Sequence, residues 1–255
     1  MSVREPDSCS APYRVRFDEA GPDGLLRTSV LLRFAQDVAW HHSASRGFGR
    51  AWYADRGLTW LVRAAVVGVD LPIEVGSEIV GTTRVVGWRR VWARRFTDFR
   101  DAAGERLAWT QIDWVLLDAN GTPTRIPSEF DDVFRAPLVQ FGLARVALGD
   151  PPSGARRLSL TVRPHELDPM DHVNNAVYAD WLDEAVIAAG DAGATRAMPR
   201  VARLEYPAPA ALGAKVVAEV WPKGDGWSFR VLDETGHELL RARLETGRDS
   251  GAATI

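Results

Sequence analysis

The sequence has almost no cysteine, no long apolar run and no surplus of basic residues, and each absence excludes a class of protein. Cys9 is the only cysteine among 255 residues, which excludes an intramolecular disulfide and a cysteine-rich metal site. No run of about 18 apolar residues occurs, so no membrane span is expected. The formal net charge is -3, whereas a chain that binds nucleic acid is usually distinctly basic.

The composition that remains predicts a soluble globular protein with a substantial core. Hydrophobic residues make up 46% of the chain and charged residues 25%. The length suffices for one large domain or two of ordinary size. The N-terminal segment lacks the apolar core of a signal peptide, and the scarcity of cysteine suits a reducing compartment, so we expect a cytoplasmic location.

The sequence indicates an internal repeat of one structural unit. Each half contains a strand, then an amphipathic helix, then several alternating, strand-like segments. The first helix carries an apolar stripe between Leu31 and Ala39, and the second is predicted from Asn175 to about Ala189. DAAGERL at 101–107 matches DETGHEL at 233–239. A helix with one apolar face needs a sheet to cover, so two helix-and-sheet units are predicted.

Residues 167–185, LDPMDHVNNAVYADWLDEA, carry the most specific motif: an Asp, a His four residues later, then VNN opening a helix. This segment resembles the active-site signature of hotdog thioesterases. The segments YRVRFDEAGPDGLLRTSVLLRFAQDVAWHH, GLTWLVRAAV and WVLLDANGTPTRIPSEF resemble the N-terminal hotdog of acyl-acyl-carrier-protein (acyl-ACP) thioesterases, within the wider 4-hydroxybenzoyl-CoA thioesterase-like group. The resemblance implies an α+β fold, a double (tandem) hotdog in which an antiparallel sheet wraps around a long helix in each unit.

The resemblance and the repeat together predict the domain boundaries. Residues 12–130 are expected to form an N-terminal hotdog that binds the acyl chain without catalysis. Residues 131–156 match neither unit and are interpreted as a linker. Residues 157–247 are expected to form the catalytic C-terminal hotdog.

Thioester hydrolysis needs a base or nucleophile and donors for the oxyanion. Asp168 lies on a turn fixed by Pro169, where a carboxylate can activate water or attack the carbonyl itself. His172 is its predicted partner. The backbone amides of Val173, Asn174 and Asn175, at the N-terminus of the expected helix, are the predicted oxyanion donors because they lack intrahelical acceptors. No metal or cofactor is implied.

Two positions depart from the acyl-ACP thioesterase pattern. In those enzymes the segment that begins with the Asp usually follows the pattern Asp-x-Asn-x-His. In this sequence Met170 occupies the position of the Asn. Those enzymes also end the strand after the helix with a Glu, whose position Pro209 occupies in the segment LEYPAP. Neither Met nor Pro can act as an acid or base. The motif that survives resembles the simpler site of the wider hotdog group.

Two binding surfaces are predicted in the first half. The resemblance assigns the wall of the acyl tunnel to Trp52, Trp60, Val62 and Trp109, although ordinary packing between helix and sheet explains each Trp equally well. The segment WRRVWARRFTDFR contains Arg89, Arg90, Arg94 and Arg95, which we interpret as a dock for an acidic carrier protein and its phosphodiester; a solvated strand face is the alternative.

The predicted function is hydrolysis of fatty acyl thioesters on ACP to a free fatty acid and the carrier thiol, in fatty acid biosynthesis. An acyl-CoA thioesterase of the wider hotdog group and a non-catalytic acyl-binding protein remain open, because the family Asn and Glu are absent. No nucleic acid or membrane partner is expected. The tandem chain is expected to be a pseudo-dimeric monomer or a homodimer.

Overall fold

The structure of the chain is a computed structural model that describes residues 7–136 and 145–247. The first half contains β1 (Ser8–Arg14), α1 (Thr28–Ser45), α2 (Arg50–Asp55), β2 (Thr59–Val69), β3 (Glu78–Arg89), β4 (Trp92–Arg100), β5 (Arg106–Leu117) and α3 (Glu129–Phe134). The second contains β6 (Arg156–Thr161), α4 (Val177–Ala188), β7 (Arg200–Glu205), β8 (Lys215–Lys223), β9 (Gly226–Asp233) and β10 (Glu238–Thr246). Single 3-10 turns lie at Phe17–Glu19, Pro164–Glu166 and Ala194–Arg196.

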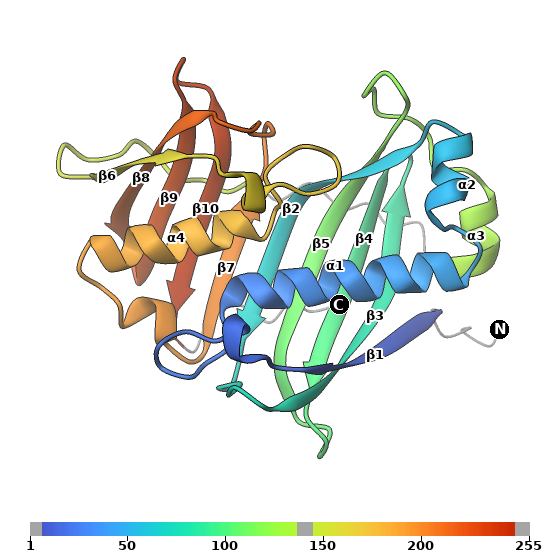
Figure 1. The fold of residues 1–255 in the computed structure, drawn as a ribbon, viewed down its shortest axis with the longest axis horizontal. Coiled ribbons are helices and arrows are strands. Elements are labelled where there is room, and N and C mark those ends of the chain that lie inside the picture. Colours follow the sequence, from blue (N-terminus) through green and yellow to red (C-terminus); the bar gives the residue numbers. More distant parts are fainter. Residues whose placement is uncertain (1–6, 137–144, 248–255) are drawn as a thin grey trace.

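The described strands form one ten-stranded antiparallel sheet in the order β1-β3-β4-β5-β2-β7-β10-β9-β8-β6. β2 pairs with β7 at the centre of the sheet. Outward from the centre the strands run β2-β5-β4-β3-β1 in the first half and β7-β10-β9-β8-β6 in the second, so corresponding strands take corresponding places. Both long helices lie on the same face of the sheet, α1 over the first half and α4 over the second (Figure 1). The predicted α+β class with a large antiparallel sheet is confirmed.

The matched sequence segments form matched turns. In DAAGERL, Gly104 has φ +84°, and in DETGHEL, Gly236 has φ +86°. The Asp101 carboxylate accepts the N–H of Glu105 at 2.8 Å, and the Asp233 carboxylate accepts that of His237 at 2.9 Å. Glycine adopts this left-handed conformation without steric cost, so the repeated Asp and Gly dictate the same hairpin twice.

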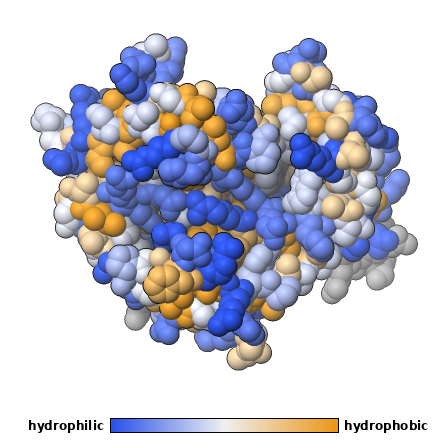
Figure 2. All heavy atoms as spheres, viewed as in Figure 1, coloured by the Kyte–Doolittle hydropathy of each residue, from blue (hydrophilic) through white to orange (hydrophobic). Residues whose placement is uncertain are grey.

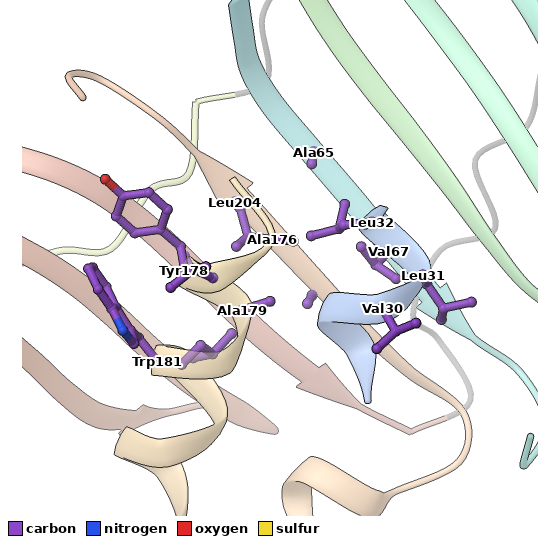
Figure 3. Packing of buried hydrophobic residues seen from close by; sticks show 14 of the residues in the cluster. Val30, Leu31, Leu32, Ala65, Val67, Ala176, Tyr178, Ala179, Trp181 and Leu204 are labelled. Atoms are coloured by element: carbon purple, nitrogen blue, oxygen red, sulfur yellow. The ribbon is translucent and has the colours of Figure 1, made fainter. Parts of the chain in front are cut away.

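The main core lies where the two helices meet the central strands. The N-terminal part of α1 supplies Val30, Leu31 and Leu32. The N-cap residue Ala176 and α4, with Tyr178, Ala179 and Trp181, pack with them against Ala65, Val67 and Leu204 of β2 and β7 (Figure 3). Since this single cluster includes residues of both halves, the halves share one core. Burial of such side chains stabilises a fold by about 1.5–3 kcal/mol each.

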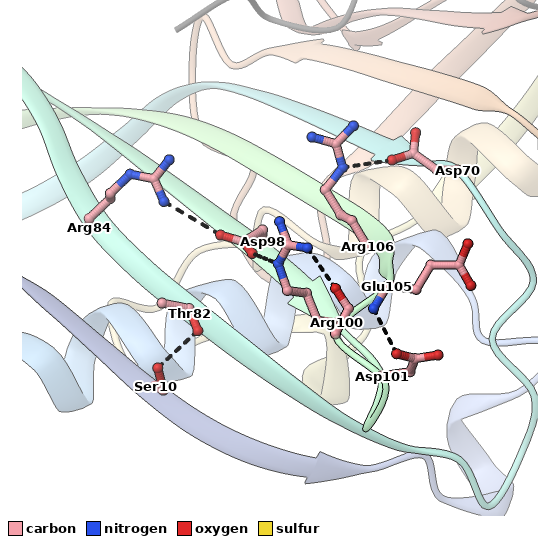
Figure 4. A network of polar contacts seen from close by, with 10 residues as sticks. Ser10, Asp70, Thr82, Arg84, Asp98, Arg100, Asp101, Glu105 and Arg106 are labelled. Atoms are coloured by element: carbon pink, nitrogen blue, oxygen red, sulfur yellow. Dashed lines mark hydrogen bonds and ion pairs between the residues drawn. The ribbon is translucent and has the colours of Figure 1, made fainter.

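The face of the sheet turned away from α1 carries a network of ion pairs in the first half. Asp98 pairs with Arg84 at 3.5 Å and with Arg100 at 2.6 Å, and Arg106 pairs with Asp70 at 2.9 Å (Figure 4). Figure 2 shows a band of polar side chains across the helix-bearing face, apolar patches on both halves and a notch between the halves at the upper edge. Within the described ranges, no helix is long and apolar enough to cross a membrane.

The element bounds differ from the predicted domains at three places, one of which is β6, whose first residue, Arg156, falls in the predicted linker. β1 begins at Ser8, ahead of the predicted start at residue 12. α3 overlaps the beginning of the predicted linker 131–156, yet Phe130 and Phe134 pack with Phe48 and Trp88 of the first half. Residues 137–144 of that linker lie outside the described residues.

Candidate active site

A cavity of about 890 Å³ lies between the two halves. The first half contributes residues of α1, α2, β2, β3, β4, β5 and α3 to its wall. The second half contributes the loop 168–175, Tyr178 of α4 and the segment 206–209. The cavity therefore brings the predicted catalytic loop of one half against the predicted acyl-binding surface of the other.

Asp168 occupies the first position of a tight turn. Its N–H donates to the carbonyl of His172 at 2.9 Å, and its own carbonyl accepts the N–H of Asp171 at 3.0 Å. The turn closes through Asp171, which has φ +60°. Carboxylate oxygen Oδ1 accepts the N–H of Met170 at 2.9 Å. Oδ2 has no hydrogen-bond partner among the described residues, so one oxygen orients the carboxylate and the other is available to a reactant.

His172 lines the same cavity and is half-buried. Its ring makes no hydrogen bond to Asp168 or to any other residue that the structure describes. The predicted pairing of these two side chains is therefore not present in this structure, although both face one cavity. Both ring nitrogens of His172 remain available to a substrate carbonyl or a water molecule.

The predicted set of oxyanion donors needs a correction. The Val173 N–H donates to the carbonyl of Ala210 at 3.0 Å, and the Asn174 N–H donates to that of Glu166 at 2.9 Å. Both amides are thus already used, because the chain forms a bridge before the helix begins at Val177. Of the three predicted donors, only the Asn175 N–H has no acceptor among the described residues.

The side chains around Asn175 hold this amide in place. The Tyr206 hydroxyl donates to the Asn175 carbonyl at 3.1 Å, and burial raises the pKa of Tyr206 so that the hydroxyl stays protonated. Asn174 accepts the Ala176 N–H at 2.9 Å and donates to Gln36 of α1 at 3.4 Å. The loop is therefore fixed by its own strand and by the helix of the other half.

The two departures from the family pattern both line the cavity. Met170 stands at its exposed rim, with its sulfur 3.9 Å from the Thr59 hydroxyl, and Pro209 lies in the wall. Glu205, four residues earlier, does not replace the missing Glu. Its carboxylate accepts the N–H of Val146 at 2.9 Å and is not part of the cavity wall.

The predicted acyl-binding residues divide between the two faces of the sheet. Trp60 and Val62 line the cavity. Trp52 lies behind the wall, with its ring 5.0 Å from that of Phe48. Trp109 does not line the cavity, because it stacks on Phe96 at 6.0 Å on the opposite face. Side chains alternate along a strand, so Trp109 and Trp114 of β5 face opposite sides.

Trp114 is a cavity residue that sequence reasoning missed, as are Trp88, Phe130 and Phe134. Side chains alternate along β5, so Trp114 must face the cavity if its neighbour Asp113 faces the opposite side. This alternation could have predicted Trp114 from the sequence. The signal for α3 was the segment SEFDDVF, whose acidic first turn and two Phe four residues apart are typical of a short helix.

The four predicted docking arginines do not form one patch. Arg89 and Arg90 are exposed, at the end of β3 and in the turn to β4. Arg94 makes a bidentate ion pair with Asp113 at 2.6 and 2.7 Å on the far face. Arg95 is only 8% exposed and lines the cavity. The docking role predicted for Arg95 is wrong, because neighbouring strand residues point to opposite faces.

The described part of the chain groups no three His, Cys, Asp or Glu side chains that could hold a metal ion. Besides an extensive apolar surface and guanidinium groups such as that of Arg95, the cavity wall presents one carboxylate, one imidazole and one free amide. Such a set suits activation of water beside an acyl chain.

Comparisons with known proteins place the chain in a family. The family model of the acyl-ACP thioesterase N-terminal domain matches residues 6–136, and that of the C-terminal domain matches residues 150–247. The chain therefore belongs to the acyl-ACP thioesterase family, and the resemblance seen in its sequence is confirmed.

Individual relatives are distant. An uncharacterized protein of Mycobacterium tuberculosis is 26% identical over 90% of this chain and 84% of its own. A chloroplastic acyl-[acyl-carrier-protein] hydrolase of Cuphea viscosissima is 26% identical, over 68% of this chain and 46% of its own length. Among solved structures, the 12:0-ACP thioesterase of Umbellularia californica has a TM-score of 0.77 at 23% identity, covering 93% of this chain and 96% of its own. That likeness shows the fold.

Proposed function

We propose that the chain is a thioesterase that hydrolyses fatty acyl thioesters, with acyl-ACP as the carrier substrate and the cytoplasm as its location. The observation that carries the proposal is the shared cavity, where the Asp168 carboxylate and the Asn175 N–H meet an apolar wall from the other half. We also interpret the two halves as two hotdog units, the second of which is catalytic.

In the proposed reaction the thioester carbonyl accepts a hydrogen bond from the Asn175 N–H, and His172 contacts the same oxygen or the incoming water. Asp168 Oδ2 takes a proton from water, hydroxide adds to the carbonyl carbon, and the carbon–sulfur bond breaks. The proton then passes to the departing thiolate, so the products are a free acid and a thiol. Alternatively, Asp168 attacks the carbon itself and water hydrolyses the resulting anhydride.

Single turnover in ¹⁸O-labelled water separates these two routes. General-base catalysis places the label in the fatty acid only. Nucleophilic attack, followed by water addition at the Asp168 carbonyl, places label in the protein carboxylate. Mass spectrometry of the peptide that contains Asp168 reads the difference.

The test of the function is release of free thiol from long-chain acyl-ACP and from the matched acyl-CoA, with Asp168→Asn in parallel. We expect turnover, faster on the ACP substrate, and a loss of about 100-fold or more in the variant. Turnover that survives the substitution would refute the role of Asp168. Faster turnover on CoA would favour the acyl-CoA alternative.

A non-catalytic acyl-binding protein is the second candidate, favoured by Met170 and Pro209 in the wall where the family has Asn and Glu. It predicts that acyl ligands bind in the cavity while neither thioester is cleaved. Titration of intrinsic tryptophan fluorescence with an acyl ligand, beside the thiol assay, distinguishes the two candidates because Trp60, Trp88 and Trp114 line the cavity.

A further inference from the structure

Arg95 places a buried positive charge in the wall of the cavity. Nη1 lies 3.0 Å from Nδ1 of His42, and Nη2 lies 3.3 Å from the Ser43 hydroxyl. No carboxylate among the described residues forms an ion pair with it. A guanidinium has five N–H groups, so three remain without an acceptor. A buried cation in this condition is costly unless another group neutralises it.

The groups behind Arg95 hold it in place without neutralising it. Because the guanidinium is always a donor, His42 Nδ1 must accept, and Nε2 then carries the hydrogen that is donated to Asp7 at 2.9 Å. Burial, reinforced by Arg95, lowers the pKa of His42, which agrees with a neutral ring. Asp7 is engaged by Arg46 through two bonds of 2.7 and 2.8 Å. The cluster therefore retains one net positive charge, that of Arg95.

A second unpartnered donor lies at the same end of the cavity. Trp88 is 2% exposed, lines the cavity, and its Nε1–H has no acceptor among the described residues. Both side chains surround the Phe134 ring, whose centroid lies 5.5 Å from the guanidinium carbon of Arg95 and 6.0 Å from the Trp88 ring. The methyl end of an acyl chain has no acceptor for these N–H groups. A ligand group with several acceptor oxygens can accept hydrogen bonds from them.

The helix α1 gives the distance from this end of the cavity to the catalytic loop. On α1, Gln36 bonds Asn174 of the loop and Ser43 bonds Arg95, and the helix rises about 10 Å between these residues. An extended chain advances roughly 1.2 Å per bond, so a chain on the order of ten carbons spans the distance.

We propose that Arg95 and Trp88 bind a carboxylate at the far end of the acyl chain, so that the preferred ligand is an ω-carboxyacyl group on the order of ten carbons long. The guanidinium provides a charge-assisted, two-point contact for a carboxylate, and the Trp88 N–H adds a third donor. The inference rests on the proposed function only for the chemistry at the thioester end.

The test uses ligands that cannot turn over, in which an amide of pantetheine replaces the thioester. One carries a decanoyl chain, one a 9-carboxynonanoyl chain and one a 10-hydroxydecanoyl chain, all of ten carbons. Dissociation constants are measured by calorimetry for the full-length protein. We expect the carboxylate ligand to bind at least about 10-fold more tightly than the decanoyl ligand. Equal binding of those two, or a preference for the hydroxyl ligand, overturns the proposal.

Variants locate the effect. Arg95→Met is expected to abolish or invert the preference, and Trp88→Phe, which keeps an aromatic ring and removes the N–H, to reduce it several-fold. Trp88→Phe keeps the test valid if Arg95→Met fails to fold. Arg89→Met removes a positive charge from the exposed end of β3 and should leave the preference ratio unchanged; a change as large as that of Arg95→Met would overturn the proposal.

The outcome is separable from that of the proposed function. Absence of thiol release from every acyl thioester, together with tight binding of the carboxylate amide, refutes the thioesterase and leaves this site standing. Thiol release without a carboxylate preference in the amide series supports the thioesterase and refutes the carboxylate site.

Discussion

The two halves contain the same loop with different side chains. Gly21 N–H bonds Leu25 O, and Gly24 N–H bonds Gly21 O, as Asp168 N–H bonds His172 O and Asp171 N–H bonds Asp168 O. In each loop an isolated bridge closes the turn, Ala20 to Leu26 and Leu167 to Val173. The backbone is thus repeated, while the carboxylate and imidazole of one copy are a Gly and a Leu in the other. Chemistry in this fold depends on side chains carried by a shared frame.

The helices α1 and α4 also correspond in position, and their contacts with the opposite half differ. Counting from the loops, Gln36 of α1 corresponds to Asp183 of α4. Gln36 contacts Asn174 in the loop that carries Asp168. Asp183 lies near Arg200, which bonds Thr28 at the start of α1. Thus α1 bonds the loop of the opposite half directly, whereas Asp183 of α4 reaches the start of α1 through Arg200, and only one of the two loops carries a carboxylate at its first position.

The largest loss of activity is expected when the loop 167–173 is given the side chains of the loop 20–26. In Asp168→Gly with His172→Leu, the turn should form as it does at Gly21 and Leu25, so the fold is retained while activity falls by about 100- to 10,000-fold. Thiol release and thermal unfolding of the same sample measure both quantities. The reciprocal change, Gly21→Asp, should not add activity, since the first loop lacks the rest of the site. Full activity in the double variant would contradict the assignment of the loop.

A smaller effect is expected at the contact between the halves. Gln36→Leu removes the 3.4 Å bond to Asn174 and should lower kcat by about 2- to 10-fold, the value of one neutral hydrogen bond. Asp183→Asn, at the corresponding position of α4, is the matched control and should leave kcat unchanged. Steady-state kinetics on one acyl thioester compares the two. Equal losses would mean that the helices act on catalysis only through overall stability.

Asp183 is also expected to make stability depend on pH. Burial raises its pKa to about 7, with Arg200 opposing the shift, whereas in the unfolded chain the value is about 3.9. The folded state therefore binds the proton more tightly, and this stabilisation is lost as pH rises from about 4 through 7. Relative to Asp183→Asn, the wild-type free energy of unfolding should fall by at least about 1 kcal/mol between pH 5 and 8, after allowance for partial exposure. Urea unfolding at both values measures it; parallel pH profiles would contradict the assignment.

The smallest effect concerns the residue that closes each loop. Gly24 has φ +78° and Asp171 has φ +60°, a region that glycine tolerates best. Asp171→Gly should stabilise the fold by about 0.5 kcal/mol, and Gly24→Ala should destabilise it by about 1 kcal/mol. Shifts in the urea midpoint of both variants test the pair. Destabilisation by Asp171→Gly would show that the Asp171 side chain contributes more than its backbone costs.

The sequence predicted the repeat, both long helices and the segment 168–175 that the structure places in the cavity wall. These features depend on local patterns, such as the matched DAAG and DETG turns and the apolar stripe of each helix. The direction of individual strand side chains was not predicted. Trp109 and Arg95 were assigned to the wrong faces because the strand register was unknown, and one residue of register inverts every side chain.

The oxyanion donors were mispredicted for a related reason. The motif indicates a helix near Asn174, but whether an amide is free depends on partners far along the chain. Ala210 accepts the Val173 N–H, and Glu166 accepts the Asn174 N–H. Such tertiary hydrogen bonds leave no periodic signal in the sequence. The buried contact of Arg95 with His42 was hidden in the same way, because the two residues lie 53 positions apart.

The pairing of β2 with β7 within one chain has a consequence for how this protein can change. In an assembly of two identical subunits, any substitution is installed at two symmetric places, so a gain at one is coupled to its effect at the other. Here the corresponding places are encoded separately, as Gly21 and Asp168 illustrate. A substitution in the cavity wall of one half therefore leaves the amino-acid sequence of the Asp168 loop unchanged. In the proposed thioesterase, substitutions in the wall and in the loop can therefore arise one at a time.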